Sequence, residues 1–222
     1  MRKKTALVTG ANRGIGLELC TQLVAAGWDV VGACRRSSEA LDAVATEVWE
    51  GIDVADDAVV GRLAARAGER VFDLLINNAG ILQHQALSAL DFDSMRAQFE
   101  VNSLGPLRVT SALLPNLTEG GKVAIVTSRM GSIDDNTSGG AYGYRMSKAA
   151  VNIAGVSLGR DLAGRGISVV LLHPGYVKTD MTRGRGQVDV GTAARGLLAR
   201  IEELQLSTSG TFFHAQGQEL PW

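Results

Sequence analysis

The chain contains little cysteine and little proline. Cys20 and Cys34 are the only cysteines, they lack the spacing of a metal site, and both lie in apolar segments. We therefore expect buried free thiols in a reducing cytoplasm and no bound metal. The sequence has only 4 prolines among 222 residues and no Pro-rich or Ser-rich stretch that would form a linker. It is predicted to form one domain, residues 1–222.

Long hydrophobic runs and an excess of charge are missing as well. No apolar run approaches the roughly 18 residues of a membrane span, and the run after the charged start Met1–Lys4 is too short for a signal peptide. The formal net charge is −1 and there is no basic run, which argues against a nucleic-acid surface. We expect a cytoplasmic globular protein that binds a small molecule, not nucleic acid and not a membrane.

Short apolar runs alternate along the chain with longer stretches of helical periodicity. This pattern predicts an α/β fold in which a parallel sheet carries helices on both faces. The predicted strands are Thr5–Thr9, Asp29–Cys34, Val48–Ile52, Val71–Ile76, Lys122–Thr127, Ile167–Leu172 and Gly210–His214. The predicted helices are residues 14–26, 38–46, 56–67, 93–116, 142–163 and 189–204.

A glycine-rich turn follows the first predicted strand. Residues 9–16 read TGANRGIG and are followed by helical periodicity. Glycines allow a ligand's phosphates to approach the backbone, and the N–H groups at a helix start attract a pyrophosphate. The spacing is G-x-x-x-G-x-G, not the G-x-G-x-x-G of the usual dinucleotide fingerprint. A chance cluster is the alternative, because the chain has 27 glycines.

Polar residues and glycines also follow the later strands. Ligands bind outside the carboxyl ends of the strands in such sheets, so these positions are expected to converge on one site. The residues at these strand ends are Arg35 and Arg36, Asp53 and Val54, the NNAG run at 77–80, Ser128, and the HPG run at 173–175.

Tyr144 and Lys148 supply the predicted chemistry. They lie four residues apart at the start of a helical stretch and so share one helix face. A nearby ammonium lowers the pKa of a phenol, which then acts as a general acid on a carbonyl or a base on an alcohol. Ser128, at a strand end, can hydrogen-bond the developing oxyanion. Taken singly, the tyrosine and lysine are an ordinary surface pair and the serine is a turn residue.

With these motifs in this order, the chain resembles the short-chain dehydrogenase/reductase family over nearly its whole length. The matching residues are TGxxxGIG at 9–16, NNAG at 77–80, Asn102, Ser128, Tyr144 with Lys148, and Pro174-Gly175. Residues 135–148, DNTSGGAYGYRMSK, look like the C-factor or Sniffer-type branch of the family. The resemblance implies a single-domain Rossmann fold, a doubly wound seven-stranded parallel sheet with strand order 3-2-1-4-5-6-7.

The resemblance also implies roles for individual residues. Tyr144 would exchange the proton, Lys148 would lower the pKa of Tyr144 and bind the nicotinamide ribose, and Ser128 would orient the substrate carbonyl. Asn102 would hold a water near Lys148 through its backbone carbonyl at a helix distortion. The residues implied to bind the cofactor are Gly10, Asn12, Arg13, Gly14, Ile15, Gly16, Arg35, Asp53, Val54, Asn78, Ala79, Gly80, Tyr144, Lys148, Pro174, Gly175, Val177 and Thr179. The resemblance implies a homodimer or homotetramer, through the apolar faces of helices 93–116 and 142–163. The alternative is that these faces pack within the chain.

Arginines favour one of the two nicotinamide cofactors. Sites selective for NAD place an acidic residue after the second strand, where this sequence has Cys34 followed by Arg35. Arg13 lies inside the glycine turn. Guanidinium groups pair well with a 2′-phosphate, so NADP(H) is expected and NAD(H) is disfavoured. The alternative is that both arginines are solvated surface charges.

The sequence therefore predicts an NADP(H)-dependent oxidoreductase that transfers a hydride between nicotinamide and an aldehyde, ketone, quinone or alcohol. The alternative is a cofactor-binding signalling protein of the C-factor type with little or no turnover. Residues 128–141 and the segment after Thr179, Asp180–Asp189, are expected to select the substrate. The shortness of the second segment predicts an open site that accepts bulky carbonyls, or a site completed by a partner. His84, His173 and His214 stand alone in the sequence and are assigned no chemistry.

Overall fold

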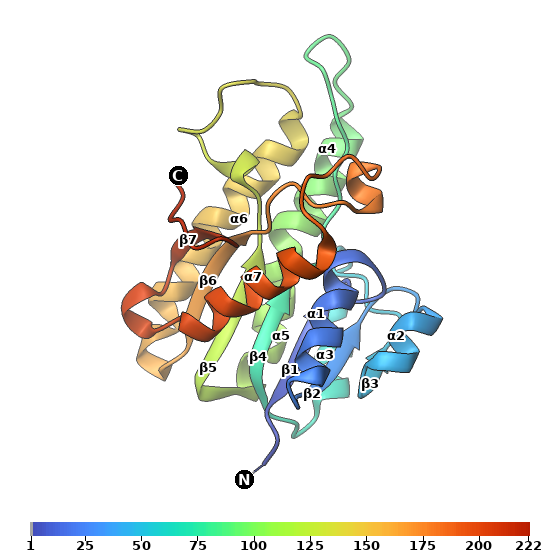
Figure 1. Ribbon diagram of the computed structural model, residues 1–222, viewed down its shortest axis with the longest axis vertical. Helices are drawn as coiled ribbons and strands as arrows, with labels where there is room; N and C mark the ends of the chain where they lie inside the picture. The colour runs from blue at the N-terminus through green and yellow to red at the C-terminus, as the bar shows by residue number, and fades with distance from the viewer. Residues whose placement is uncertain (1) are drawn as a thin grey trace.

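The computed structural model describes residues 2–222 and places one parallel sheet between two layers of helices (Figure 1). Neighbouring strands follow the predicted order β3-β2-β1-β4-β5-β6-β7, and every pair is parallel. The strands are β1 (Thr5–Thr9), β2 (Asp29–Ala33), β3 (Glu47–Trp49), β4 (Phe72–Asn77), β5 (Leu117–Val126), β6 (Ser168–His173) and β7 (Thr211–His214).

Seven α-helices connect these strands. They are α1 (Gly14–Ala25), α2 (Glu39–Val44), α3 (Val59–Ala67), α4 (Phe92–Phe99), α5 (Gly105–Leu113), α6 (Tyr142–Asp161) and α7 (Val190–Glu203). Short 3₁₀ turns occupy Leu114–Asn116, Arg129–Gly131, Ala163–Arg165, Asp180–Thr182 and Leu206–Thr208. Within residues 2–222, no helix combines the length and apolar character that crossing a bilayer requires.

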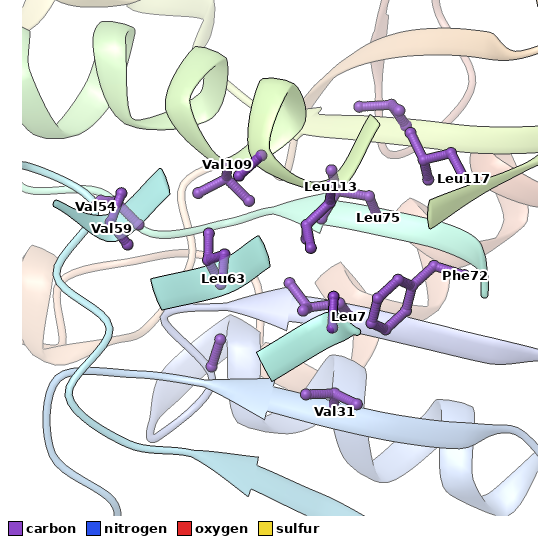
Figure 2. Packing of buried hydrophobic residues seen from close by; sticks show 14 of the residues in the cluster. Leu7, Val31, Val54, Val59, Leu63, Phe72, Leu75, Val109, Leu113 and Leu117 are labelled. Atoms are coloured by element: carbon purple, nitrogen blue, oxygen red, sulfur yellow. The ribbon is translucent and has the colours of Figure 1, made fainter. Parts of the chain in front are cut away.

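Each face of the sheet packs against its own set of helices. Successive side chains of a strand point to opposite faces, so Leu7 of β1 belongs to one buried cluster and its neighbours Ala6 and Val8 to the other. Figure 2 shows Leu7 packed with Leu63 of α3 and Val109 of α5. Helices α1, α2 and α7 contribute to the second cluster. Because the strands are buried on both faces, the sheet holds the loops at its carboxyl edge in fixed positions.

The predicted single helix over residues 93–116 is wrong. α4 ends at Phe99, a π-helical turn spans Glu100–Leu104, and α5 follows. Pro106 supplies the physical reason, because it has no N–H and so leaves the carbonyl of Asn102, four residues earlier, without its α-helical partner. The wider π turn accommodates this break and places Asn102 at its centre.

Two strands, β3 and β5, differ from their predicted bounds by more than one residue. β5 begins at Leu117, which pairs with Phe72 ahead of a register shift, and not at Lys122. β3 stops at Trp49 because the chain turns at Gly51, which has a φ of 79°. Both differences lie away from the loops that leave the carboxyl ends of β1, β4, β5 and β6 on one side of the molecule (Figure 1).

Candidate active site

The glycine turn between β1 and α1 leaves no room for side chains. Gly10 and Gly14 have left-handed backbones with φ of 64° and 54°. A Cβ on Gly10 would lie 2.9 Å from the Cα of Ala79, and a Cβ on Gly16 would lie 2.2 Å from the carbonyl oxygen of Gly10. Side chains at these positions would push the turn away from the exit of β4, so glycine is required on steric grounds.

The start of α1 presents backbone N–H groups without a side-chain cap. Arg13 is the N-cap residue, its side chain makes no capping hydrogen bond, and the first turn holds no acidic residue. The N–H groups and the positive end of the helix dipole are therefore available to an anion. A pyrophosphate fits this donor set, since the adjacent glycines allow it to approach closely.

Asn78 and Ala79 join the exit of β4 to the glycine turn. The Thr9 hydroxyl accepts hydrogen bonds from the backbone N–H groups of Asn78 (3.0 Å) and Ala79 (3.1 Å). The Asn78 amide donates to the carbonyls of Thr9 (2.9 Å) and Gly10 (3.3 Å). The ends of the two central strands thus form one hydrogen-bonded unit, in which Asn78 stabilises the centre of the sheet.

The residues predicted for the adenine end follow β2 and β3. Arg35 is exposed after β2, and the Ser38 hydroxyl a little further on donates to the carbonyl of Asn12 in the glycine turn (2.8 Å). The Asp53 carboxylate accepts a backbone N–H two residues on (3.1 Å). Val54 is buried against the start of α5. The loop after β2 therefore adjoins the glycine turn. Contacts of Arg35, Asp53 and Val54 with the cofactor stay a prediction.

Arg13 forms an ion pair across the site. Its guanidinium lies 3.1 Å from the Asp180 carboxylate, and both side chains are exposed. Asp180 follows Thr179, whose methyl group would lie 3.6 Å from a Cβ on Gly14. The glycine turn and the segment after β6 therefore face each other directly. The joint role of Arg13 and Arg35 at a 2′-phosphate stays a prediction.

The segment after β6 is held by its own hydrogen bonds. Gly175 turns the chain with a φ of 89°. Val177 is buried and forms a β-bridge with Val188, and its carbonyl accepts the Thr182 hydroxyl (2.7 Å). This bracing fixes the backbone that leads from Pro174 to the side of the glycine turn.

Ser128, Tyr144 and Lys148 are all buried where β5 ends and α6 begins, with exposed fractions of 7%, 8% and 4%. The Lys148 ammonium lies 5.8 Å from the centre of the Tyr144 ring. It also donates to the carbonyl of Val126 at 2.9 Å. The sequence motifs predicted this grouping, and the structure brings the side chains together out of contact with bulk water.

The pKa of Tyr144 does not follow the expected direction. Burial raises the pKa of the phenol because the phenolate loses hydration, and the neighbouring Ser128 hydroxyl only partly opposes this rise. Burial also lowers the pKa of Lys148 to about 8. Among the chain's own groups, burial therefore outweighs the attraction between phenolate and ammonium.

Asn102 ties the exit of β4 to α6. Its side-chain Nδ2 donates to the carbonyl of Ile81 (2.9 Å) and to the Ser147 hydroxyl (3.0 Å), and its side-chain Oδ1 accepts the N–H of Ile81 (2.9 Å). The Ser147 hydroxyl in turn donates to the Tyr144 carbonyl (2.8 Å). The helix distortion expected at Asn102 is confirmed as the π turn, whereas the water that Asn102 would hold stays a prediction.

Sequence reasoning missed two residues beside the buried group. A Cβ on Gly131 would lie 2.6 Å from the carbonyl carbon of Lys148, so only glycine lets the turn after β5 cross α6 this closely. Arg145 donates to the Ser138 hydroxyl (2.8 Å) and to the carbonyls of Gly139 (3.3 Å) and Met130 (3.4 Å), which ties the loop 128–141 to α6. Neither contact has a periodic signal in the sequence, because each joins the irregular loop after β5 to α6.

Two histidines that stand alone in the sequence form a pair in the structure. The rings of His173 and His214, at the ends of β6 and β7, lie edge to face with centres 5.1 Å apart. Burial, followed by the proximity of His214, lowers the pKa of His173 to about 3. The pair is therefore uncharged at neutral pH and packs as a structural element below the segment that starts at Pro174.

The short chain dehydrogenase family model matches residues 4–189 of the chain. A 1-hydroxy-2-glutathionyl-2-methyl-3-butene dehydrogenase of Rhodococcus sp. (strain AD45) is 44% identical over 224 residues, covering 98% of this chain and 99% of that protein. The C-signal protein of Myxococcus xanthus is 51% identical over 153 residues, covering 68% of this chain and 92% of that protein.

Solved structures give the same result. The NADPH-bound carbonyl reductase from chicken fatty liver superposes with a TM-score of 0.90 at 30% identity, and the match covers 100% of both chains. The chain therefore belongs to the short chain dehydrogenase family and is an oxidoreductase.

Proposed function

We propose that this oxidoreductase uses NADP(H) and transfers a hydride between nicotinamide and a carbonyl or alcohol substrate, with Tyr144 as general acid or base. The observation that carries the proposal is the joint burial of Tyr144, Ser128 and Lys148. This group follows β5 in a sheet whose β1 ends in a turn that fits a pyrophosphate. The substrate class is an aldehyde, a ketone or a quinone.

The cofactor would lie along the carboxyl edge of the sheet. When bound, NADPH supplies the hydride. The residues proposed to hold it are Gly10, Asn12, Arg13, Gly14, Ile15 and Gly16 at the pyrophosphate and 2′-phosphate, Arg35 at the 2′-phosphate, Asp53, Val54, Asn78, Ala79 and Gly80 at the adenine side, and Tyr144, Lys148, Pro174, Gly175, Val177 and Thr179 at the nicotinamide side. The carbonyl reductase neighbour crystallised with NADPH supports this choice.

In the reductive direction, Tyr144 donates its proton to the carbonyl oxygen of the substrate. Burial raises the pKa of the phenol, which keeps the proton in place until that oxygen becomes basic. The Ser128 hydroxyl donates a hydrogen bond to the same oxygen and stabilises its developing charge. The Lys148 ammonium stabilises the phenolate that remains, so Tyr144 can act as the base when an alcohol is oxidised.

Asn102 is proposed to serve the return of a proton to Tyr144. Pro106 deprives the Asn102 carbonyl of its α-helical partner, and the π turn redirects it. A Cβ on Gly80 would lie 3.3 Å from the Asn102 amide oxygen and 3.8 Å from the Lys148 nitrogen. Gly80 therefore keeps a space beside the Asn102 side chain and Lys148. The proposed water would lie near Lys148 and link it to the backbone carbonyl of Asn102.

A signalling role with little turnover is the second candidate. The 51% identity to C-signal favours it. A protein that only senses a bound nucleotide needs the glycine turn but does not need a buried proton donor. Tight NADPH binding with no oxidation of NADPH by a panel of aldehydes, ketones and quinones would support the signalling role.

Tyr144→Phe is expected to lower the turnover of NADPH with the same panel by roughly 10²- to 10⁴-fold, because the proton donor is lost. NADPH binding, measured by fluorescence titration, should be unchanged. Tyr142→Phe is the matched control, since Tyr142 begins the same helix and is less deeply buried. Comparable turnover by Tyr144→Phe and the unmodified chain would remove Tyr144 from its proposed role.

Arg35→Leu is expected to raise the KM for NADPH by roughly 10- to 100-fold, the loss associated with one charge-assisted hydrogen bond. The KM for NADH should change little, because NADH has no 2′-phosphate. Arg66→Leu, at an exposed position of α3, controls for the loss of one positive charge. Equal effects of Arg35→Leu on the two cofactors would contradict the assignment of NADP selectivity to Arg35.

NADPH affinity is expected to fall with rising pH. The pKa of Lys148 is about 8. Its charge is therefore present below pH 8 and is lost above it, and the Kd for NADPH should rise about tenfold between pH 7 and 9 because the competent fraction falls by that factor. In Lys148→Met the Kd should be weak and nearly independent of pH. A Kd of the unmodified chain that is constant over this range would argue against ribose binding by a charged Lys148.

We also propose that the chain forms a homodimer or homotetramer through the outer face of α4 and α6. Phe92 and Phe99 lie seven residues apart on α4, and Met146 and Ile153 do so on α6. Their exposed fractions run from 39% to 65%, and the two helices pack side by side. An apolar patch shared by neighbouring helices is typical of an interaction surface, and a second copy presents the same patch in return.

Ile153→Glu is expected to lower the molar mass in sedimentation velocity from that of a dimer or tetramer, because a carboxylate would be placed in the proposed interface. Leu87→Glu is the matched control, since Leu87 is 70% exposed in the loop after β4 and lies outside the patch. A monomeric unmodified chain would overturn the proposal.

A further inference from the structure

The helix that carries Tyr144 begins without a cap of its own. The N-cap position of α6 is Ala141, whose side chain cannot accept a hydrogen bond. Ala141 has a φ of 47°, and among residues 2–222 it shares a positive φ with only one other residue that is not glycine, Arg183. Such a backbone is strained for an alanine, so neighbouring groups must hold the start of α6 in place.

Gln85, in the loop after β4, supplies the missing cap. Its backbone carbonyl accepts the N–H of Ala141 at 3.0 Å, and its side-chain Oε1 accepts the N–H of Gly143 at 3.3 Å. These are N–H groups at the helix start that have no partner within the helix. A single residue, 58 positions away from Gly143 in the sequence, therefore satisfies two donors in the turn that leads to Tyr144.

Gln85 is itself fixed in position. Its side chain is only 5% exposed, and its amide donates to the Ser94 hydroxyl of α4 at 2.8 Å. Gly143 also packs tightly on α4, because a Cβ there would lie 2.8 Å from Nε2 of Gln98 and 2.9 Å from the side chain of Met95. The first turn of α6 thus lies in a seat formed by α4 and Gln85.

Tyr144 directly follows Gly143 and has its backbone held from both sides. On its C-terminal side the Ser147 hydroxyl, which Asn102 also binds, donates to the Tyr144 carbonyl. On its N-terminal side, the Gln85 backbone carbonyl accepts the N–H of Ala141, and the Gln85 side-chain oxygen accepts the N–H of Gly143. Any tilt of this turn moves the phenol relative to Ser128.

We infer that Gln85 is a positioning residue for the reaction: it fixes the first turn of α6 and so directs the Tyr144 hydroxyl toward the substrate oxygen. The inference rests on the proposed role of Tyr144 as the proton donor. A misplacement of about 1 Å at a reacting group can reduce a rate by roughly 10²-fold, so the loss of this cap should act on kcat.

Gln85→Leu keeps the size of the side chain and removes its acceptor. We expect kcat to fall roughly 10- to 100-fold while the Kd for NADPH stays within about twofold, since the glycine turn is untouched. Gln85→Glu retains an oxygen for the Gly143 N–H and should restore most of kcat. His84→Leu is the matched control, because His84 lies exposed in the same loop and its side chain bonds neither Ser94 nor α6 in the described residues. Its kcat should stay within about twofold of the unmodified chain.

A double-mutant cycle separates positioning from general damage. In the Tyr144→Phe background, Gln85→Leu should cause no further loss of turnover, because no phenol remains to be positioned. An equal loss in both backgrounds would overturn the inference while leaving the role of Tyr144 intact. Thermal unfolding of each variant shows whether a loss of turnover in Gln85→Leu comes from an unfolded chain.

A second readout does not depend on turnover. The chain has only 3 tyrosines. The titration of Tyr144 is therefore obtained by subtracting the ultraviolet absorbance of the Tyr144→Phe variant from that of the chain that keeps Tyr144, at each pH. In Gln85→Leu the loosened turn should admit water, and the titration midpoint of Tyr144 should move down toward that of a free tyrosine. An unchanged midpoint would overturn the inference even if the protein reduced no carbonyl at all.

Discussion

The rest of the site depends on the contact between the glycine turn and the exit of β4. Thr9 and Asn78 hydrogen-bond across the two central strands, and Gly10 approaches Ala79 so closely that a Cβ would not fit. This contact orients α1, whose uncapped start fits a pyrophosphate, and it directs the chain from Gly80 toward Asn102. The proposed phosphate site and the proposed catalytic helix, on opposite halves of the sheet, are thereby held in a fixed relation.

Burial sets the electrostatic character of the catalytic group. It raises the pKa of Tyr144 and lowers that of Lys148, so each residue alone resists its charged form. A proton donor benefits from this arrangement, since the phenol keeps its proton until a substrate oxygen gains negative charge. The ammonium close to the ring then stabilises the phenolate at the step where it forms. The same burial requires exact backbone placement, which explains the supports from Ser147 and Gln85 on either side of Tyr144.

Much of the fold and of the catalytic group could be predicted from the sequence, because both leave local signals. Alternating apolar runs predicted the strands, the family resemblance supplied their order, and the spacing of Tyr144 and Lys148 placed them on one helix face. The break in the helix at Asn102 was expected from the resemblance alone, because residues 93–116 keep helical periodicity, although Pro106 contains the cause. The contact of Gln85 with Gly143 joins segments far apart in the chain, and the contacts of Gly131 and Arg145 join an irregular loop to α6, so no periodic pattern in the sequence predicts them. The pKa of Tyr144 was predicted in the wrong direction because the extent of its burial is a property of the folded chain.

The central claim is that the buried group directs hydride transfer from NADPH to a substrate carbonyl carbon. Its most direct test is to supply NADPH deuterated at the nicotinamide C4 position, on the hydrogen that is transferred, with aldehydes, ketones or quinones, and to analyse the products by mass spectrometry. With an aldehyde or a ketone, the account predicts one deuterium in the alcohol product, bound to the former carbonyl carbon. With a quinone, it predicts that the cofactor loses its deuterium in proportion to the quinone reduced. Oxidation of the cofactor without transfer of deuterium to an aldehyde or ketone substrate would contradict it.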